Sequence, residues 1–129
     1  IGGLKLSERL VNDSLSWMYA GNRQHHILGL VKGQVGLHHY SFEMPDAASY
    51  FKLGDLLDRA DKQLMWGPGR HRPGDNIYCY YTDASGAMIE CSSGMSLIAY
   101  DKSFTPNITT NLARPGNVRS NHARHTRHR

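Results

Sequence analysis

Two pairs of adjacent histidines are the residues whose type and spacing most directly suggest chemistry in this sequence. They are His25-His26 and His38-His39. Because successive side chains of a strand point to opposite faces, each pair forces one imidazole onto each face of its strand. Neutral imidazole binds divalent metals, and two histidines with one carboxylate form the facial arrangement of non-haem Fe(II) sites. The pairs therefore direct attention to carboxylates on neighbouring strands.

The strand expected over residues 37–44 orients the second pair. Every second residue from Tyr40 to Met44 is apolar, so this face, which also carries His38, is expected to pack on a helix. His39 lies on the opposite face. We therefore expect the His39 imidazole to point into a polar space.

A hairpin near the end of the folded part supplies the carboxylate. Its two strands flank a turn at residues 83–86, and closing that turn pairs Tyr80 with Glu90, within a residue of register. The opposite face of the hairpin pairs Cys79 with Cys91, so both cysteines are expected to be packing residues. One face thus gathers a phenol and a carboxylate.

His39 and Glu90 would supply two ligands of a divalent metal site. A third ligand is not apparent from the pattern. The first histidine pair does not resolve the question, because both faces of its strand are otherwise apolar and the choice between His25 and His26 stays open.

Positioning these groups requires a mixture of short strands and one helix. Strands are expected over residues 4–10, 14–20, 25–31, 37–44, 64–66, 76–82 and 87–93. Asp46 is a good N-cap, and the face formed by Leu53, Leu56, Leu57 and Ala60 predicts a helix that runs to about Asp61. Residues 67–74 are so rich in Gly and Pro that regular structure is not expected there.

The predicted order is three strands followed by a β-α-β-β-β unit, which indicates an α+β fold. The first three strands read as the same unit without its opening strand and helix. Residues 1–36 are therefore expected to be the C-terminal part of a truncated first βαβββ module, and residues 37–105 a second module. Residues 106–129 are expected to form a basic, disordered tail.

Composition narrows the classes of function. With 129 residues, 40% of them hydrophobic, the chain can form one domain with a core, and no apolar run is long enough to span a membrane. The net charge of +4 belongs to the tail: without the five arginines beyond residue 112, 10 Lys and Arg face 11 Asp and Glu. The tail has no aromatic residue for base stacking, which argues against nucleic-acid binding. Two cysteines favour a reducing, cytoplasmic setting.

Three segments together resemble the catalytic domain of type I extradiol ring-cleavage dioxygenases, in the vicinal oxygen chelate superfamily. They are His38–Asp46 (HHYSFEMPD), Trp66–His71 (WGPGRH) and Tyr80–Glu90 (YYTDASGAMIE). The resemblance covers roughly residues 4–105. It implies paired βαβββ modules that form a curved mixed sheet around a metal cavity.

The resemblance also implies roles for individual residues. His39 and Glu90 match metal ligands, with Fe(II) as the expected metal and Mn(II) as the alternative. His26 matches the acid/base histidine, His71 a substrate-binding loop histidine, and Tyr80 a tyrosine that assists catecholate binding. The implied reaction is extradiol cleavage of a catechol by O2, in the catabolism of aromatic compounds.

The family's first metal-binding histidine has no counterpart here, because it would lie upstream of Ile1. We therefore expect the isolated chain to bind metal poorly and to be inactive. A glyoxalase-like, metal-dependent lyase or isomerase and a non-catalytic small-ligand-binding protein of the same fold stay open as alternatives. An uncovered edge of a truncated sheet would favour pairing with another copy, as a homo-oligomer.

Overall fold

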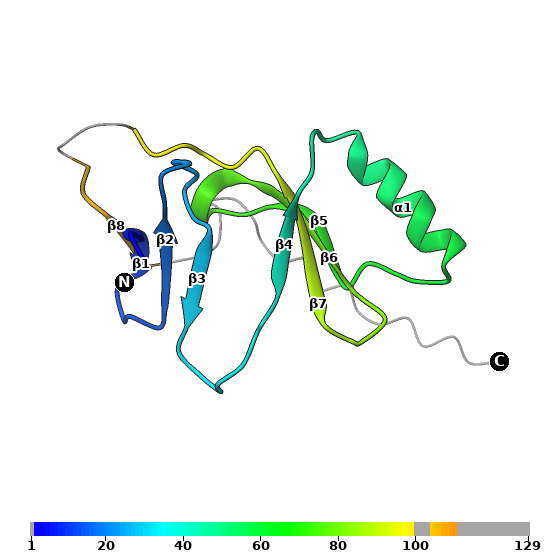
Figure 1. The fold of residues 1–129 in the computed structure, drawn as a ribbon, viewed down its shortest axis with the longest axis horizontal. Coiled ribbons are helices and arrows are strands. Elements are labelled where there is room, and N and C mark those ends of the chain that lie inside the picture. Colours follow the sequence, from blue (N-terminus) through cyan, green and yellow to red (C-terminus); the bar gives the residue numbers. More distant parts are fainter. Residues whose placement is uncertain (1, 100–103, 111–129) are drawn as a thin grey trace.

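The computed structural model describes residues 2–99 and 104–110, which form two four-stranded sheets and one α-helix (Figure 1). The elements are β1 (Lys5–Leu10), β2 (Leu15–Tyr19), β3 (Leu28–Val31), β4 (Tyr40–Glu43), α1 (Ser49–Arg59), β5 (Trp66–Arg70), a 3-10 turn (Pro73–Asp75), β6 (Ile77–Thr82), β7 (Met88–Ser93) and β8 (Asn107–Thr109). The α+β class is confirmed. The strand–helix–strand–strand–strand order of the second unit is as expected.

The first sheet has the order β3-β2-β1-β8. Strands β1, β2 and β3 form an antiparallel meander, whereas β8 runs parallel to β1, with Leu10 opposite Thr109. The expectation that the tail is disordered from residue 106 is therefore wrong at residues 107–109. These residues form a strand that pairs with the otherwise free edge of β1. Residues 111–129, including the arginine-rich part of the tail, lie outside the described residues.

The outer strand of this sheet, β3, leaves an apolar edge exposed. All four of its residues are exposed, and Leu30 and Val31 retain 53% and 58% of their surface. Such an edge can pair with another chain. Pairing with a second copy stays a prediction.

The second sheet has the order β4-β7-β6-β5. Strand β4 runs parallel to β7 and is connected to it through α1 and the other two strands, while β7, β6 and β5 are antiparallel. The expectation of an irregular segment over residues 67–74 is wrong at residues 67–70, because Trp66–Arg70 forms β5. Strand β5 is an edge strand with a register shift, where Pro68 can be accommodated although it has no N–H to donate.

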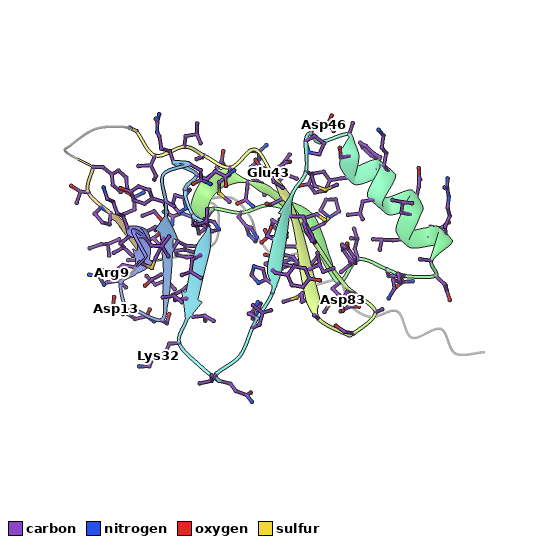
Figure 2. All side chains as sticks on the ribbon, viewed as in Figure 1. Arg9, Asp13, Lys32, Glu43, Asp46 and Asp83 are labelled. Atoms are coloured by element: carbon purple, nitrogen blue, oxygen red, sulfur yellow. The ribbon has the colours of Figure 1, made fainter. Side chains whose placement is uncertain are left out.

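Helix α1 begins at Ser49, three residues after the expected cap. Asp46, just before the helix (Figure 2), still organises its start. Asp46 Oδ1 accepts hydrogen bonds from the backbone N and Oγ of Ser49, both at 2.8 Å. Leu57 is buried as expected, but Leu56 is 59% exposed. Phe42, expected beneath the helix, is likewise 55% exposed, so the helix does not cover this residue of β4.

Tyr50 links helix α1 to the second sheet through hydrogen bonds. Its hydroxyl lies 3.1 Å from the carbonyl oxygen of Ile77 and 3.3 Å from that of Cys91. The helix therefore covers the face of β6 and β7 that carries the two cysteines, and leaves the opposite face for other groups. No helix in the described part of the chain has the length and apolar character of a membrane span.

Cys79 and Cys91 lie directly opposite each other in the β6–β7 ladder, as predicted. Both are free thiols, exposed by 1% and 3%. Burial raises the pKa of the Cys79 thiol to about 11 and also raises that of Cys91. Both are packing residues under the helix.

We expect neither cysteine to react with a disulfide reagent in the native protein at about pH 8, because the reactive species is the thiolate and both thiols are buried and protonated. Both should react at once in concentrated guanidinium chloride. The measurement is a thiol titration with and without denaturant. Rapid labelling of the native protein would contradict this packing.

Candidate metal centre

The β6–β7 hairpin sets the distance between its two functional side chains. Tyr80 and Glu90 are direct cross-strand partners, as the turn length predicted. Asp83 Oδ1 holds the turn by accepting hydrogen bonds from the backbone N of Ser85 at 2.8 Å and of Ala87 at 3.0 Å. Hydrogen bonds from Ser85 and from Tyr40 lower the pKa of Asp83 to about 2, so the turn keeps its charged acceptor at all ordinary pH values.

His39 comes to the hairpin from the parallel strand. Ser41 in β4 pairs with Glu90 in β7, so His39, two residues before Ser41, approaches Glu90 from the same side of the sheet. His39 Nε2 is 3.2 Å from Glu90 Oε2, and its ring meets the Tyr80 ring edge-on at 5.3 Å. The His38 ring binds the other nitrogen of this imidazole, with 2.7 Å between the two Nδ1 atoms.

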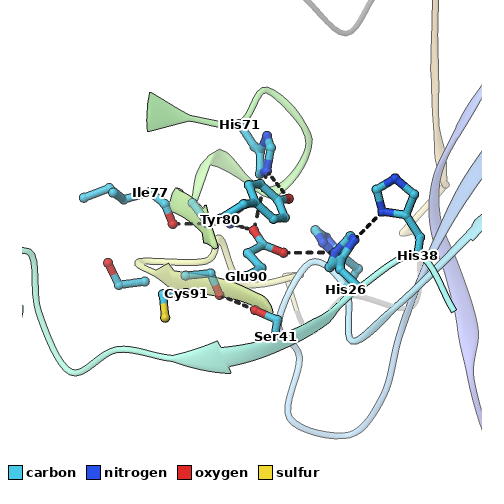
Figure 3. Close-up of polar contacts among 12 residues, drawn as sticks. His26, His38, Ser41, His71, Ile77, Tyr80, Glu90 and Cys91 are labelled. Atoms are coloured by element: carbon cyan, nitrogen blue, oxygen red, sulfur yellow. Dashed lines mark hydrogen bonds and ion pairs between the residues drawn. The ribbon is translucent and has the colours of Figure 1, made fainter. Parts of the chain in front are cut away.

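His71 completes the group from the far edge of the sheet (Figure 3). Its Nε2 lies 3.0 Å from the Tyr80 hydroxyl and 3.5 Å from Glu90 Oε1. The imidazole stacks on the ring of Tyr78, with centroids 3.7 Å apart, while Trp66 stacks on Tyr80 at 5.3 Å. These aromatic contacts fix the orientation of the loop histidine that follows β5.

Glu90 is the electrostatic centre of the group. It is 6% exposed, and burial alone would raise its pKa, but hydrogen bonds from His39 and His71 outweigh burial and lower the pKa to about 2. The carboxylate is therefore ionised. Burial and the charge of Glu90 raise the pKa of the Tyr80 phenol, so Tyr80 keeps its proton and can donate it in a hydrogen bond.

Asn76 also belongs to this group, although sequence reasoning missed it. It is fully buried, and its Nδ2 donates to Glu90 Oε1 at 3.4 Å. Its Oδ1 has no hydrogen-bond partner among the described residues, which leaves an acceptor for a donor entering the site. The alternation that joined Tyr78 and Tyr80 on one face extends back to Asn76, and could have identified it.

His26 reaches the site from the other sheet, through the β2–β3 connection. The segment after β7 crosses this connection: His25 N donates to Ser96 O at 2.7 Å, and Ser96 N donates to Gly74 O at 2.8 Å. His26 is thereby placed where the charges of Glu90, His71 and His39 act on it. Burial, followed by the neighbouring His25, lowers its pKa to about 4, so the ring is neutral at pH 7.

The five candidate residues thus gather from both sheets. His39, Tyr80, His71 and Glu90 are linked by contacts, and Figure 3 places His26 beside them. The structure resolves the choice that strand alternation left open, because His26 faces this group whereas His25 faces Glu8.

The donor pair His39–Glu90 fits part of the coordination shell of a divalent metal. Neighbouring ligands of an octahedral ion with bonds of about 2.1 Å lie roughly 3 Å apart, and the two donor atoms are 3.2 Å apart. No set of three or more His, Cys, Asp and Glu side chains in the described part of the chain is grouped to hold a metal. The pair could therefore supply two ligands of such an ion, with the remaining positions left to other groups.

Gly74 leaves room for the His26 ring. Its φ is +75°, and a Cβ there would collide with the Met95 sulfur and lie 3.3 Å from two atoms of the His26 ring. We expect Gly74→Ala to lower the free energy of unfolding by about 1–3 kcal/mol more than Gly86→Ala. Gly86 has φ +86° but nothing within 4 Å, so it is a matched control for backbone strain. Urea unfolding of both variants checks this, and equal losses would contradict the contact.

Comparisons with solved structures identify the fold. The 2,3-dioxygenase LapB from Pseudomonas sp. KL28 superposes with a TM-score of 0.75 at 24% identity, covering 84% of this chain and 39% of that one. A Mn(II)-bound glyoxalase from Novosphingobium aromaticivorans has the same TM-score, identity and coverage of this chain, and 35% of its own length is covered. An extradiol ring-cleaving dioxygenase from B. fuscum gives 0.72 at 21% identity, covering 84% and 32%.

The chain therefore has the vicinal oxygen chelate fold, and it spans about a third of the length of these proteins. No family model and no curated protein matches the sequence. Dioxygenases and a glyoxalase share this architecture, so the choice of reaction depends on the side chains of the site.

Proposed function

We propose that this chain is part of the catalytic domain of a cytoplasmic extradiol dioxygenase, which cleaves a catechol ring with O2. The observation that carries the proposal is the 3.2 Å approach of His39 Nε2 to Glu90 Oε2, with Tyr80 and His71 in contact beside it. The LapB and B. fuscum neighbours are named as dioxygenases, and one related B. fuscum structure is a complex with HPCA.

His39 and Glu90 would hold the metal, with Fe(II) as the first candidate and Mn(II) as the second. A divalent ion bound there lowers the pKa of catechol hydroxyls and offers open positions to substrate and O2. The third protein ligand would come from outside the residues described here. Two ligands alone hold a metal weakly, so we expect activity only in the complete protein.

The other three residues would act on the substrate. Tyr80, a neutral phenol, donates a hydrogen bond to a catechol oxygen and orients the ring. His71 directs a second hydrogen bond toward negative charge that develops on oxygen, and its stack on Tyr78 holds it in place. His26, neutral at pH 7, takes a proton from the reacting group and returns it when the ring opens.

A glyoxalase-like lyase or isomerase is the second candidate, because the glyoxalase neighbour has the same TM-score and identity as LapB. That reaction would use the metal pair but not the combination of His26, His71 and Tyr80. Changing these three residues should then leave the activity largely intact. A non-catalytic binding protein would keep its ligand affinity after metal removal.

The direct experiment uses the complete protein, loaded with Fe(II) without oxygen and then given a catechol and air. We expect O2 uptake in equal amount to catechol and a coloured ring-opened product. Parallel loading with Mn(II) compares the two metals. Absence of product across mono- and bicyclic catechols, from protein that holds its metal, would exclude the proposal.

A further inference from the structure

A buried chain of hydrogen bonds leads from Glu8 through His25 to His26. Glu8 Oε2 lies 3.1 Å from His25 Nε2, and His25 Nδ1 lies 2.9 Å from His26 Nδ1. Glu8 and His25 are each 6% exposed. Both are outside the metal pair, and the roles proposed above do not use them.

The chemistry of these atoms orders the protons along the chain. The oxygens of a carboxylate accept hydrogen bonds, so we assign the donor of this contact to His25 Nε2–H and the acceptor to Glu8 Oε2. The Nδ1 of a neutral His25 then holds a lone pair. The 2.9 Å contact requires a donor on the other side, which is His26 Nδ1–H. His26 Nε2 is left with a free lone pair.

We propose that Glu8 and His25 are positioning residues that hold His26 as its Nδ1–H tautomer, with Nε2 free to accept a proton. This inference rests on the function proposed above. A buried carboxylate that orients an imidazole through a hydrogen bond is an established way to prepare a general base. Here the carboxylate acts through a second imidazole.

The order of protons depends on a neutral His25. Burial lowers the pKa of His25, although the nearby Glu8 opposes this, so the neutral ring is favoured. A doubly protonated His25 would reverse the order and place the lone pair of His26 on Nδ1. The two rings stand at 87° to each other with their centroids 5.2 Å apart, so the 2.9 Å contact between the Nδ1 atoms is not part of a face-to-face stack.

Backbone pairing and ion pairing hold the chain Glu8–His25–His26, called the histidine relay below, in place. Glu8 lies in β1 opposite Asn107 of β8, and its second oxygen is 3.7 Å from Arg72 Nη1. The backbone N of His25 donates to Ser96 O at 2.7 Å. Because both partners are fixed by backbone pairing, the hydrogen bonds set the rotation of the His26 ring.

The relay also balances the charge of the proposed proton transfer. When the substrate O–H bond breaks, an N–H bond forms at His26 Nε2 and the ring becomes a cation. Its Nδ1–H then donates more strongly to His25, whose own Nε2–H faces the Glu8 carboxylate. The proton returns from Nε2 to oxygen later, so the relay ends as it began.

Histidine tautomers can be measured without any activity. The complete, metal-free protein is labelled with 15N-histidine, and ring nitrogen shifts are recorded at about pH 7.5. We expect His25 as the Nε2–H tautomer and His26 as the Nδ1–H tautomer. His26 with its proton on Nε2 would overturn the proposal, and this first arm requires no variant.

Glu8→Gln tests the role of the carboxylate, and Glu43→Gln is the control. Glu43 is exposed, and among the described side chains it accepts a hydrogen bond from Gln24 alone. We expect Glu8→Gln to reduce the His26 Nδ1–H population and to lower kcat about 10- to 100-fold, with KM and metal content unchanged. Unchanged tautomers and kcat would overturn the relay. If the protein cleaves no catechol but the tautomers shift as expected, the relay stands and the proposed reaction fails.

Discussion

Replacing Glu90 with glutamine should lower the affinity of the complete protein for a divalent metal by more than about 100-fold. Loss of a group that only supports a metal ligand already costs 10- to 100-fold, and Glu90 is proposed as a ligand itself. The carboxylate is buried and its pKa is about 2, so it is charged at every pH where the metal would bind. Glutamine keeps the shape but loses the charge.

Calorimetric titration with Mn(II) measures this loss, and circular dichroism checks that the fold is kept. Glu43→Gln is the matched control, since Glu43 lies in the neighbouring strand and is exposed (Figure 2). The control should bind metal as the unmodified protein does. A Glu90→Gln variant with unchanged affinity would remove Glu90 from the metal site.

Replacing His26 with glutamine should have the opposite signature: metal is retained and turnover is lost. His26 is not one of the proposed ligands, so metal content should stay within a factor of about two. A positioned acid/base group contributes roughly 10²- to 10⁴-fold to the rate, and kcat should fall by that amount. Oxygen uptake with a catechol measures kcat, and mass spectrometry measures the metal.

Asn22→Ala controls for damage to the β2–β3 connection, because Asn22 is exposed and its side chain hydrogen-bonds only to Gln24 among the described side chains. This variant should keep full turnover. A His26→Gln variant that turns over normally would leave no acid/base role for His26. It would favour the glyoxalase-like reaction.

The cross-strand part of the site was predictable because a short antiparallel turn determines register. Once residues 83–86 were recognised as a turn, Tyr80 was expected opposite Glu90, within a residue of register, and Cys79 opposite Cys91, and the ladder has these pairs. His39 was also expected correctly on the side of Glu90, but it precedes β4, and its 2.7 Å contact with His38 shows that the two imidazoles do not point to opposite faces as strand alternation predicted.

The choice between the first two histidines could not be made from the sequence. Strand β3 begins at Leu28, so His25 and His26 lie in a connection where alternation of faces does not apply. Their directions follow from contacts that are distant along the chain, with Glu8 for one and the Glu90 group for the other.

The edge strand β5 was not predicted, because its local composition is typical of a loop. Glycine and proline in residues 67–70 predicted a loop, but the backbone of this segment pairs with β6. At Gly67 a Cβ would lie 2.8 Å from the Tyr78 carbonyl oxygen, so the glycine permits close approach of the two strands. Trp66 and His71 reach the site because this segment is a strand, which its propensities alone did not indicate.

We propose that one metal ion binds between the imidazole of His39 and the carboxylate of Glu90. A crystal structure of the complete protein loaded with Mn(II), with anomalous scattering recorded, tests this directly. We expect a single peak about 2.0–2.3 Å from His39 Nε2 and from a Glu90 oxygen. A fully loaded crystal with the metal elsewhere, and these two side chains still bonded to each other, would contradict it.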